Sequence, residues 1–309
     1  MDDSRRNVLL AGGAIAALAA LRPALAASPA LLTRPVPRTG ERLPAVGLGT
    51  AIVFDIAEDA ARRAERSQVI AALVENGARV VDTAPSYGTA ESVVGDLVAA
   101  LGVRERLFLA TKVRAAPRAA AAAEMQASLR RLRSERLDLM QIHNPGADLG
   151  AAADQLAQLR EMKQSGVFRY VGVTHFQESA NERLVALMER ERLDFVQLNY
   201  SMAERSAEAR LLPAAVATGT AVLVNLPFAR GKLFAAVRGK PLPDWAAEFG
   251  AASWGQFFLK FVLAEEAVTC AIPGMDKPAY VLDNLDAARG RLPDAALRAK
   301  MAGYLDSLR

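Results

Sequence analysis

After residue 45 the chain alternates short apolar segments with longer amphipathic ones, and this alternation limits the fold more than any other feature. The apolar segments are often β-branched, as expected for parallel strands that are buried on both faces. Eight of them are expected as strands, at residues 46–50, 79–82, 107–112, 137–143, 170–174, 195–198, 221–225 and 269–273. Helices are expected between and after them, at residues 67–76, 91–100, 119–133, 151–164, 179–190, 207–217, 253–264, 278–288 and 293–308.

Eight strand–helix units without a break in composition favour one closed barrel over two domains, although 309 residues could hold two. A doubly wound sheet would also alternate, but no Gly-rich dinucleotide turn follows the first strand. We therefore predict a single (β/α)8 TIM barrel over residues 28–309, with an N-terminal β-hairpin that turns at residues 38–40 and an extra C-terminal helix. One long segment, residues 227–252, is expected as a functional loop.

The first 27 residues have the layout of an export signal. The paired Arg5 and Arg6 precede an apolar stretch at residues 8–21, and small residues follow at 24–26. The motif around the arginines resembles the bacterial twin-arginine signal, which implies contact with the twin-arginine export machinery and a folded protein in the periplasm. The apolar stretch is short for a membrane span, so no stable span is expected after cleavage, and an uncleaved anchor is the alternative.

Composition disfavours several kinds of partner. The formal net charge of +4 arises from 38 basic and 34 acidic residues without a basic run, so nucleic acid is not expected to bind. The single cysteine, Cys270, excludes an internal disulfide and a cysteine metal cluster. The two histidines, His143 and His175, also argue against a zinc centre, so no metal is expected.

Polar side chains stand at the ends of three consecutive predicted strands. These are Asp82, Lys112 and His143, and Tyr87 follows in the loop after the first of them. Each has an ordinary structural explanation when it is taken alone, such as a capping acid, a lysine that extends to solvent or a satisfied core histidine. In a barrel, however, the carboxyl ends of the strands surround one opening, so the four side chains are expected to converge there.

Their chemistry is complementary. An ammonium beside a phenol stabilises the phenolate, and a nearby carboxylate keeps that ammonium charged and in place. A phenol in this setting can give a proton to a carbonyl oxygen, and an imidazole on the same oxygen orients it. A lyase that uses Lys112 as a Schiff-base nucleophile is an alternative, but Asp82 argues against it because a charged lysine is a poor nucleophile.

The segments DTAPSYG, ATKV, LDLMQIHNP, YVGVTHF and IPG…DNL resemble, in order, the signatures of the aldo-keto reductase family. The resemblance implies reduction of an aldehyde or ketone by a nicotinamide cofactor, NADP(H) or NAD(H). It also implies that Tyr87 is the general acid, that Lys112 and Asp82 tune it and that His143 orients the carbonyl. The alternative from the same resemblance is a protein that binds NADP(H) as a redox sensor with little turnover.

The resemblance places cofactor contacts in three groups. The nicotinamide carboxamide is assigned to residues after the fifth strand and on the sixth, the pyrophosphate to the segment NLPFARGKL, and the adenosine to residues after the eighth strand. The positions are Gly49, Thr50, Thr174, His175, Gln197, Asn225, Leu226, Phe228, Gly231, Lys232, Ile272, Gly274, Lys277, Asp283 and Asn284. Lys277 and Arg230 are the candidates for the 2′-phosphate of NADPH, and the choice between NADPH and NADH stays open.

Overall fold

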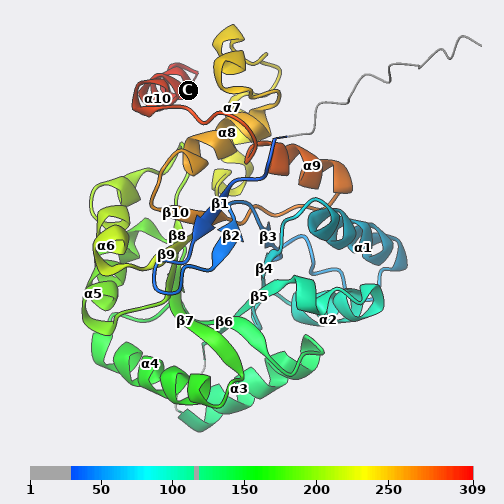
Figure 1. Cartoon of the computed structure of the whole chain (residues 1–309), viewed down its shortest axis with the longest axis vertical. Helices are drawn as coiled ribbons and strands as arrows, with labels where there is room; N and C mark the ends of the chain where they lie inside the picture. The colour runs from blue at the N-terminus through cyan, green and yellow to red at the C-terminus, as the bar shows by residue number, and fades with distance from the viewer. Residues whose placement is uncertain (1–28, 115–117, 309) are drawn as a thin grey trace, which may run out of the picture.

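The computed structural model describes residues 29–114 and 118–308, so the predicted signal at residues 1–27 lies outside the described part. Eight parallel strands lie side by side in chain order from β3 to β10 (Figure 1). Parallel bridges from Val46 to Ala271 and from Gly49 to Gly274 join the two outer strands. The predicted (β/α)8 barrel is confirmed. The strands are β3 (Leu48–Gly49), β4 (Val80–Asp82), β5 (Phe108–Val113), β6 (Leu137–His143), β7 (Phe168–His175), β8 (Phe195–Asn199), β9 (Ala221–Asn225) and β10 (Val268–Ala271).

Alternation along these strands sorts side chains into two cores. On β6, Met140 and Ile142 belong to the outer core between strands and helices, whereas Leu139 belongs to a smaller core inside the barrel. The inner core also holds Phe108 and Phe195. Since successive side chains point to opposite faces of a strand, the residue two positions after an inner apolar one also faces inward. This places polar residues above the inner core, at the carboxyl ends of the strands.

Helices surround the barrel (Figure 1). Their bounds are α1 (Ala60–Glu75), α2 (Ala90–Leu101), α3 (Arg118–Arg131), α4 (Leu149–Gln164), α5 (Asn181–Glu191), α6 (Leu211–Thr218), α7 (Lys232–Ala236), α8 (Trp254–Leu263), α9 (Pro278–Asp286) and α10 (Ala295–Ser307). α1 begins seven residues before its predicted start. Asp59 caps it by accepting a hydrogen bond from the backbone N–H of Arg62, and its first turns are polar and lack the apolar period used for the prediction.

The segment at residues 227–252 differs from the expected loop. It contains α7 and two 3-10 helices, Ala229–Gly231 and Asp244–Phe249. Trp245 anchors it, because its ring packs against Phe257 of α8 and Tyr304 of α10 at centroid distances of 5.5 and 5.8 Å. These short helices escape prediction because each is too brief to show a helical period.

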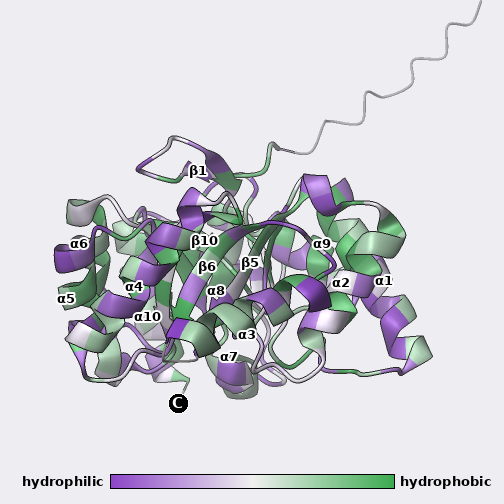
Figure 2. Ribbon diagram, turned by 90° about the horizontal axis from the view of Figure 1, so that it is seen from below, coloured by the Kyte–Doolittle hydropathy of each residue, from purple (hydrophilic) through white to green (hydrophobic). Residues whose placement is uncertain are grey.

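The predicted hairpin is confirmed: β1 (Thr33–Pro35) pairs antiparallel with β2 (Arg42–Pro44). Val36 and Leu43 extend the inner core at the amino-terminal end of the barrel. Figure 2 shows β1 and α7 at opposite ends of the molecule, so the hairpin closes the end away from the carboxyl ends of the strands. Within the described ranges, no helix has the length and apolarity needed to cross a membrane.

Candidate active site

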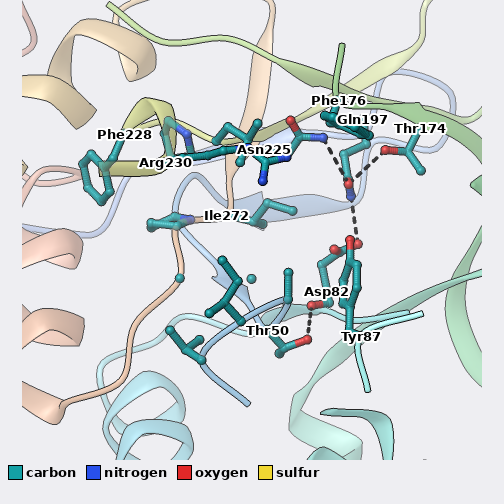
Figure 3. A pocket seen from close by; sticks show the side chains of 18 of the residues that line it. Thr50, Asp82, Tyr87, Thr174, Phe176, Gln197, Asn225, Phe228, Arg230 and Ile272 are labelled. Carbon is teal, nitrogen blue, oxygen red and sulfur yellow. Dashed lines mark hydrogen bonds between the residues drawn. The ribbon is translucent and has the colours of Figure 1, made fainter. Parts of the chain in front are cut away.

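A cavity of about 540 Å³ opens at the carboxyl ends of the strands. Asp82, Tyr87 and His143 line it, so three of the four predicted proton-transfer residues share one space. Figure 3 shows Tyr87 and Asp82 on one side and Arg230 and Phe228 on the other. The cavity is therefore long enough to separate a reacting end from a second binding region.

Asp82 and Lys112 form a buried ion pair at the base of the reacting end. The Lys112 ammonium donates to Asp82 Oδ2 at 2.5 Å and to the carbonyl oxygen of Thr83 at 2.9 Å, and its side chain has no exposed area. Burial alone would lower the pKa of Lys112, but the attraction of Asp82 and then of Tyr87 outweighs it, so the pKa is raised. The lysine is thus held as a cation.

Tyr87 lies directly over this cation. The Lys112 Nζ is 4.8 Å from the centroid of the Tyr87 ring. The ring of His143 meets that of Tyr87 edge-on, with centroids 5.8 Å apart and an interplanar angle of 90°. The phenol is thus adjacent to both the ammonium and the imidazole, which is the arrangement needed for a proton donor with an adjacent positioning group.

His143 is neutral in this environment. Burial, then the positive charges of Lys112 and Arg114 and the neighbouring His175, lower the pKa of His143 from 6.5 to about 3. The hydroxyl of Ser86 lies 3.4 Å from Nδ1 of His143. When that hydroxyl donates to Nδ1, the single proton of the ring is on Nε2, which makes the ring a hydrogen-bond donor at that atom.

A chain of amides extends from Asp82 across the barrel interior. Asp82 Oδ1 accepts from Gln197 Nε2 at 2.8 Å and from Gln141 Nε2 at 3.1 Å. Gln197 Oε1 in turn accepts from Thr174 Oγ1 at 3.0 Å and from Asn225 Nδ2 at 3.4 Å (Figure 3). Asn225 Oδ1 is buried without a hydrogen-bond partner among the described residues. An unsatisfied acceptor in the cavity wall is costly unless a ligand or water donates to it.

The backbone beside this amide is strained. Leu226, Ala229 and Arg230 all have positive φ, at 51°, 48° and 55°, and Gly231 follows at 83°. Side-chain-bearing residues rarely adopt this conformation, and such strain concentrates at ligand-binding segments. Residues 226–231 thus form one wall of the cavity in a conformation that the sequence gives no local reason to adopt.

The cavity gathers most of the predicted cofactor positions but not all of them. Its lining includes Gly49, Thr50, Thr174, Gln197, Asn225, Leu226, Phe228, Gly231, Ile272 and Gly274. The remaining five, which do not line it, are His175, Lys232, Lys277, Asp283 and Asn284.

Each of these five has another environment. His175 Nδ1 accepts the backbone N–H of Gln177, and Lys232 is 75% exposed, with Nζ 3.8 Å from Glu204. Lys277 Nζ is 5.9 Å from the Tyr280 ring centroid. Asp283 accepts from Ser253 and Gln256, and the Asn284 side chain is buried. The assignment of these five stays a prediction.

Sequence reasoning missed several residues of the cavity and its network: Gln141, Ser86, Asn144, Phe176 and Arg114. For Gln141 a signal was present. It stands two positions before His143 on β6, so strand alternation places both inside the barrel. The others lie in loops or beyond strand ends, where no strand or helix period in the sequence indicates which way a side chain points.

The fold and this cavity define a barrel protein with an acid–base site that can accept a small molecule. Residues 45–300 match the model of the Aldo/keto reductase family. The chain belongs to the aldo-keto reductase family.

Individual relatives agree with this assignment. The methylglyoxal reductase YeaE of Escherichia coli is 31% identical over 260 residues, 82% of this chain and 89% of that protein. An aldo-keto reductase of Mycolicibacterium smegmatis is 35% identical over 148 residues, 47% of this chain and 49% of that protein. The chain thus spans about half the length of several relatives that it matches.

A solved structure extends the likeness to the fold. An aldo-keto reductase of Klebsiella pneumoniae, in complex with NADP and acetate, has a TM-score of 0.73 and 26% identity, over 87% of this chain and 92% of that one.

Proposed function

We propose that this protein reduces an aldehyde or ketone to an alcohol with NAD(P)H, and that Tyr87 is the proton donor. One observation carries the proposal: the Tyr87 ring stands 4.8 Å from a buried lysine that is kept charged by Asp82, at the wall of a cavity that also contains neutral His143. Burying an ion pair is costly, and apolar side chains would stabilise the same core better. The arrangement therefore points to a role in function rather than in stability.

The residues of the cavity fit a nicotinamide cofactor. The unpartnered Asn225 Oδ1 and the hydroxyl of Thr174 provide hydrogen-bonding atoms for a carboxamide near the tetrad. The left-handed backbone at residues 226–231 and the Arg230 guanidinium suit the anionic part of a dinucleotide. The Klebsiella pneumoniae relative was solved with NADP, which supports NADP(H) here, with NAD(H) as the alternative.

Each side chain of the site then has a separate role in the reaction. When bound, the cofactor supplies hydride chemistry, which no side chain provides. The Tyr87 hydroxyl donates its proton to the carbonyl oxygen as negative charge develops there, and the Lys112 ammonium stabilises the phenolate that remains. Neutral His143 donates a hydrogen bond to the same oxygen and orients it. Asp82, fixed by Gln141 and Gln197, keeps Lys112 in place.

Replacement of the phenol tests the proposal. In Tyr87→Phe we expect turnover of an aldehyde panel to fall about a hundredfold or more, the range that general acids contribute. Binding of NADPH or NADH, measured by protein fluorescence, should persist because Tyr87 is not among the residues assigned to the cofactor. Tyr304→Phe is the matched control, since Tyr304 packs between Trp245 and Trp254 outside the cavity.

Wild-type turnover in Tyr87→Phe would show that the proton-donor assignment is wrong. If the unmodified protein binds either cofactor but reduces no carbonyl, the redox-sensor function gains support instead.

We also propose that residues 1–27 direct export of the folded protein to the bacterial periplasm by the twin-arginine route. The support is the sequence itself: paired Arg5 and Arg6, an apolar stretch and small residues before residue 27.

A further inference from the structure

Two arginines in the cavity wall are not balanced by acids. The charged residues that line the cavity are Asp82, Arg114 and Arg230, together with neutral His143. Asp82 is neutralised by Lys112. Neither Arg114 nor Arg230 makes an ion pair with a carboxylate in the part of the chain that the structure describes. The cavity therefore presents two positive charges to whatever occupies it.

The two arginines serve different regions. Arg230 belongs to the left-handed segment, its guanidinium lies 5.2 Å from the Phe176 ring centroid, and Figure 3 shows it across the cavity from Tyr87. Arg114 instead follows β5 directly, two residues beyond Lys112. Its charge reaches His143, where it contributes, after burial and Lys112, to the lowered pKa. Arg114 is thus a second cation, besides buried Lys112, whose charge acts on the reacting end.

The environment of Arg114 leaves its side chain available. The nearby carboxylate of Glu124 accepts the backbone N–H of Arg114 at 2.9 Å, so that acid binds the main chain. Arg114 is solvent-exposed while it lines the cavity. Apolar side chains line the same cavity, including Ile52, which is 76% exposed. An incoming molecule therefore meets apolar side chains and one guanidinium in the same cavity as Tyr87 and His143.

We propose that Arg114 selects carbonyl substrates that carry an anionic group, a carboxylate or a phosphate, on an otherwise apolar body. The inference rests on the proposed reductase function and adds its substrate class. A planar guanidinium binds either anion through two parallel hydrogen bonds, which a neutral ester or alcohol cannot match. The same positive charge raises the rate of encounter with anions at low ionic strength.

The test compares matched substrates that differ only in charge. We expect kcat/KM for 4-formylbenzoate to exceed that for its methyl ester, and for succinic semialdehyde to exceed that for its methyl ester. In Arg114→Gln, the acid-to-ester ratio should fall about tenfold, consistent with the loss of a charge-assisted hydrogen bond, whatever change the variant makes to the rate for the ester. Arg114→Lys should retain part of the preference. Glyceraldehyde 3-phosphate against glyceraldehyde separates phosphate from carboxylate recognition.

Arg118→Gln is the control, because Arg118 is exposed on α3 and pairs with Glu161. It removes one positive charge four positions along the chain, at a residue that does not line the cavity. The acid-to-ester ratio should also fall as salt is raised in the wild type but not in Arg114→Gln. An unchanged ratio in Arg114→Gln, with aldehydes still reduced, would overturn the anion assignment and leave the reductase function intact.

A binding measurement separates the two proposals if no aldehyde is reduced. Titration calorimetry with benzoate and methyl benzoate reports the anion site without turnover. Weaker benzoate binding in Arg114→Gln than in Arg118→Gln would support the site even if the reductase function failed. Equal binding in both variants would overturn it.

Discussion

At the scale of single residues, the site is organised around the carboxylate of Asp82. Its two oxygens receive three side-chain donors, from Lys112, Gln141 and Gln197. A buried carboxylate with its hydrogen bonds satisfied has one preferred orientation, so it can hold Lys112 under Tyr87. Loss of either partner of the pair would leave a buried charge uncompensated, which makes both residues costly to replace.

The low pKa of His143 leads to a prediction about stability and pH. Its pKa in the folded protein, about 3, is below the unfolded value of 6.5. The unfolded chain therefore binds this proton more readily, and the contribution to stability is present above pH 6.5 and lost as pH falls towards 3. Chemical denaturation from pH 8 to about 4 should show a smaller acid loss of stability in His143→Gln than in the wild type.

Direct titration provides the second measurement. The chain has two histidines, so His175→Gln leaves a single imidazole to follow by nuclear magnetic resonance. Its signals should stay those of a neutral ring through pH 5 to 8, the range in which an ordinary histidine titrates. A midpoint near pH 6.5 would contradict the neutral donor role given to His143.

At the scale of elements, strand periodicity determines what the sequence alone can predict. The structure brings Asp82 and His143, near the ends of β4 and β6, to one cavity and pairs Lys112 of β5 with Asp82, because a parallel barrel brings all strand ends to one opening. The same two-residue alternation along β6 would have predicted that Gln141 faces the barrel interior. Segments without a helical or strand period could not be predicted. Leu226, Ala229, Arg230 and Gly231 have positive φ with no local sequence signal for it, and Arg114 reaches the cavity from a loop.

The junction of β3 with β10 gives a prediction about barrel closure. A Cβ at Gly49 would stand 2.6 Å from the carbonyl oxygen of Ile272, which is backbone and cannot move aside. We expect Gly49→Ala to lower the free energy of unfolding by about 2 kcal/mol or more, the range for overpacked cores. Its cofactor affinity should fall as well, because both residues line the cavity.

Gly303→Ala is the matched control. Gly303 lies inside α10 with nothing within 4 Å of the added Cβ, so the same substitution should raise stability by about 1 kcal/mol through helix propensity. Chemical denaturation of both variants measures the difference. Equal stabilities would show that the contact between β3 and β10 does not limit the barrel.

At the scale of the whole molecule, the two ends of the barrel have separate tasks. The amino-terminal end is closed by the hairpin, where Arg38 donates to the carbonyl oxygens of Leu193 and Thr218, and Arg169 pairs with Glu41. The carboxyl-terminal end holds the cavity. Because the site draws side chains from strands between residues 48 and 271, it exists only when the entire barrel has formed.

This dependence on the complete fold bears on export. A protein that needs a closed barrel to bind a dinucleotide made in the cytoplasm would have to fold and bind it before leaving, which the twin-arginine route permits. Replacing Arg5 and Arg6 together by lysine should leave the uncleaved chain in the cytoplasm, while Arg62→Lys, a surface change on α1, should not alter export. Cell fractionation with mass measurement of the N-terminus distinguishes these results. Periplasmic accumulation of the double-lysine variant would refute the twin-arginine assignment. Another export route would then have to carry the protein, and the assignment of the active site would not change.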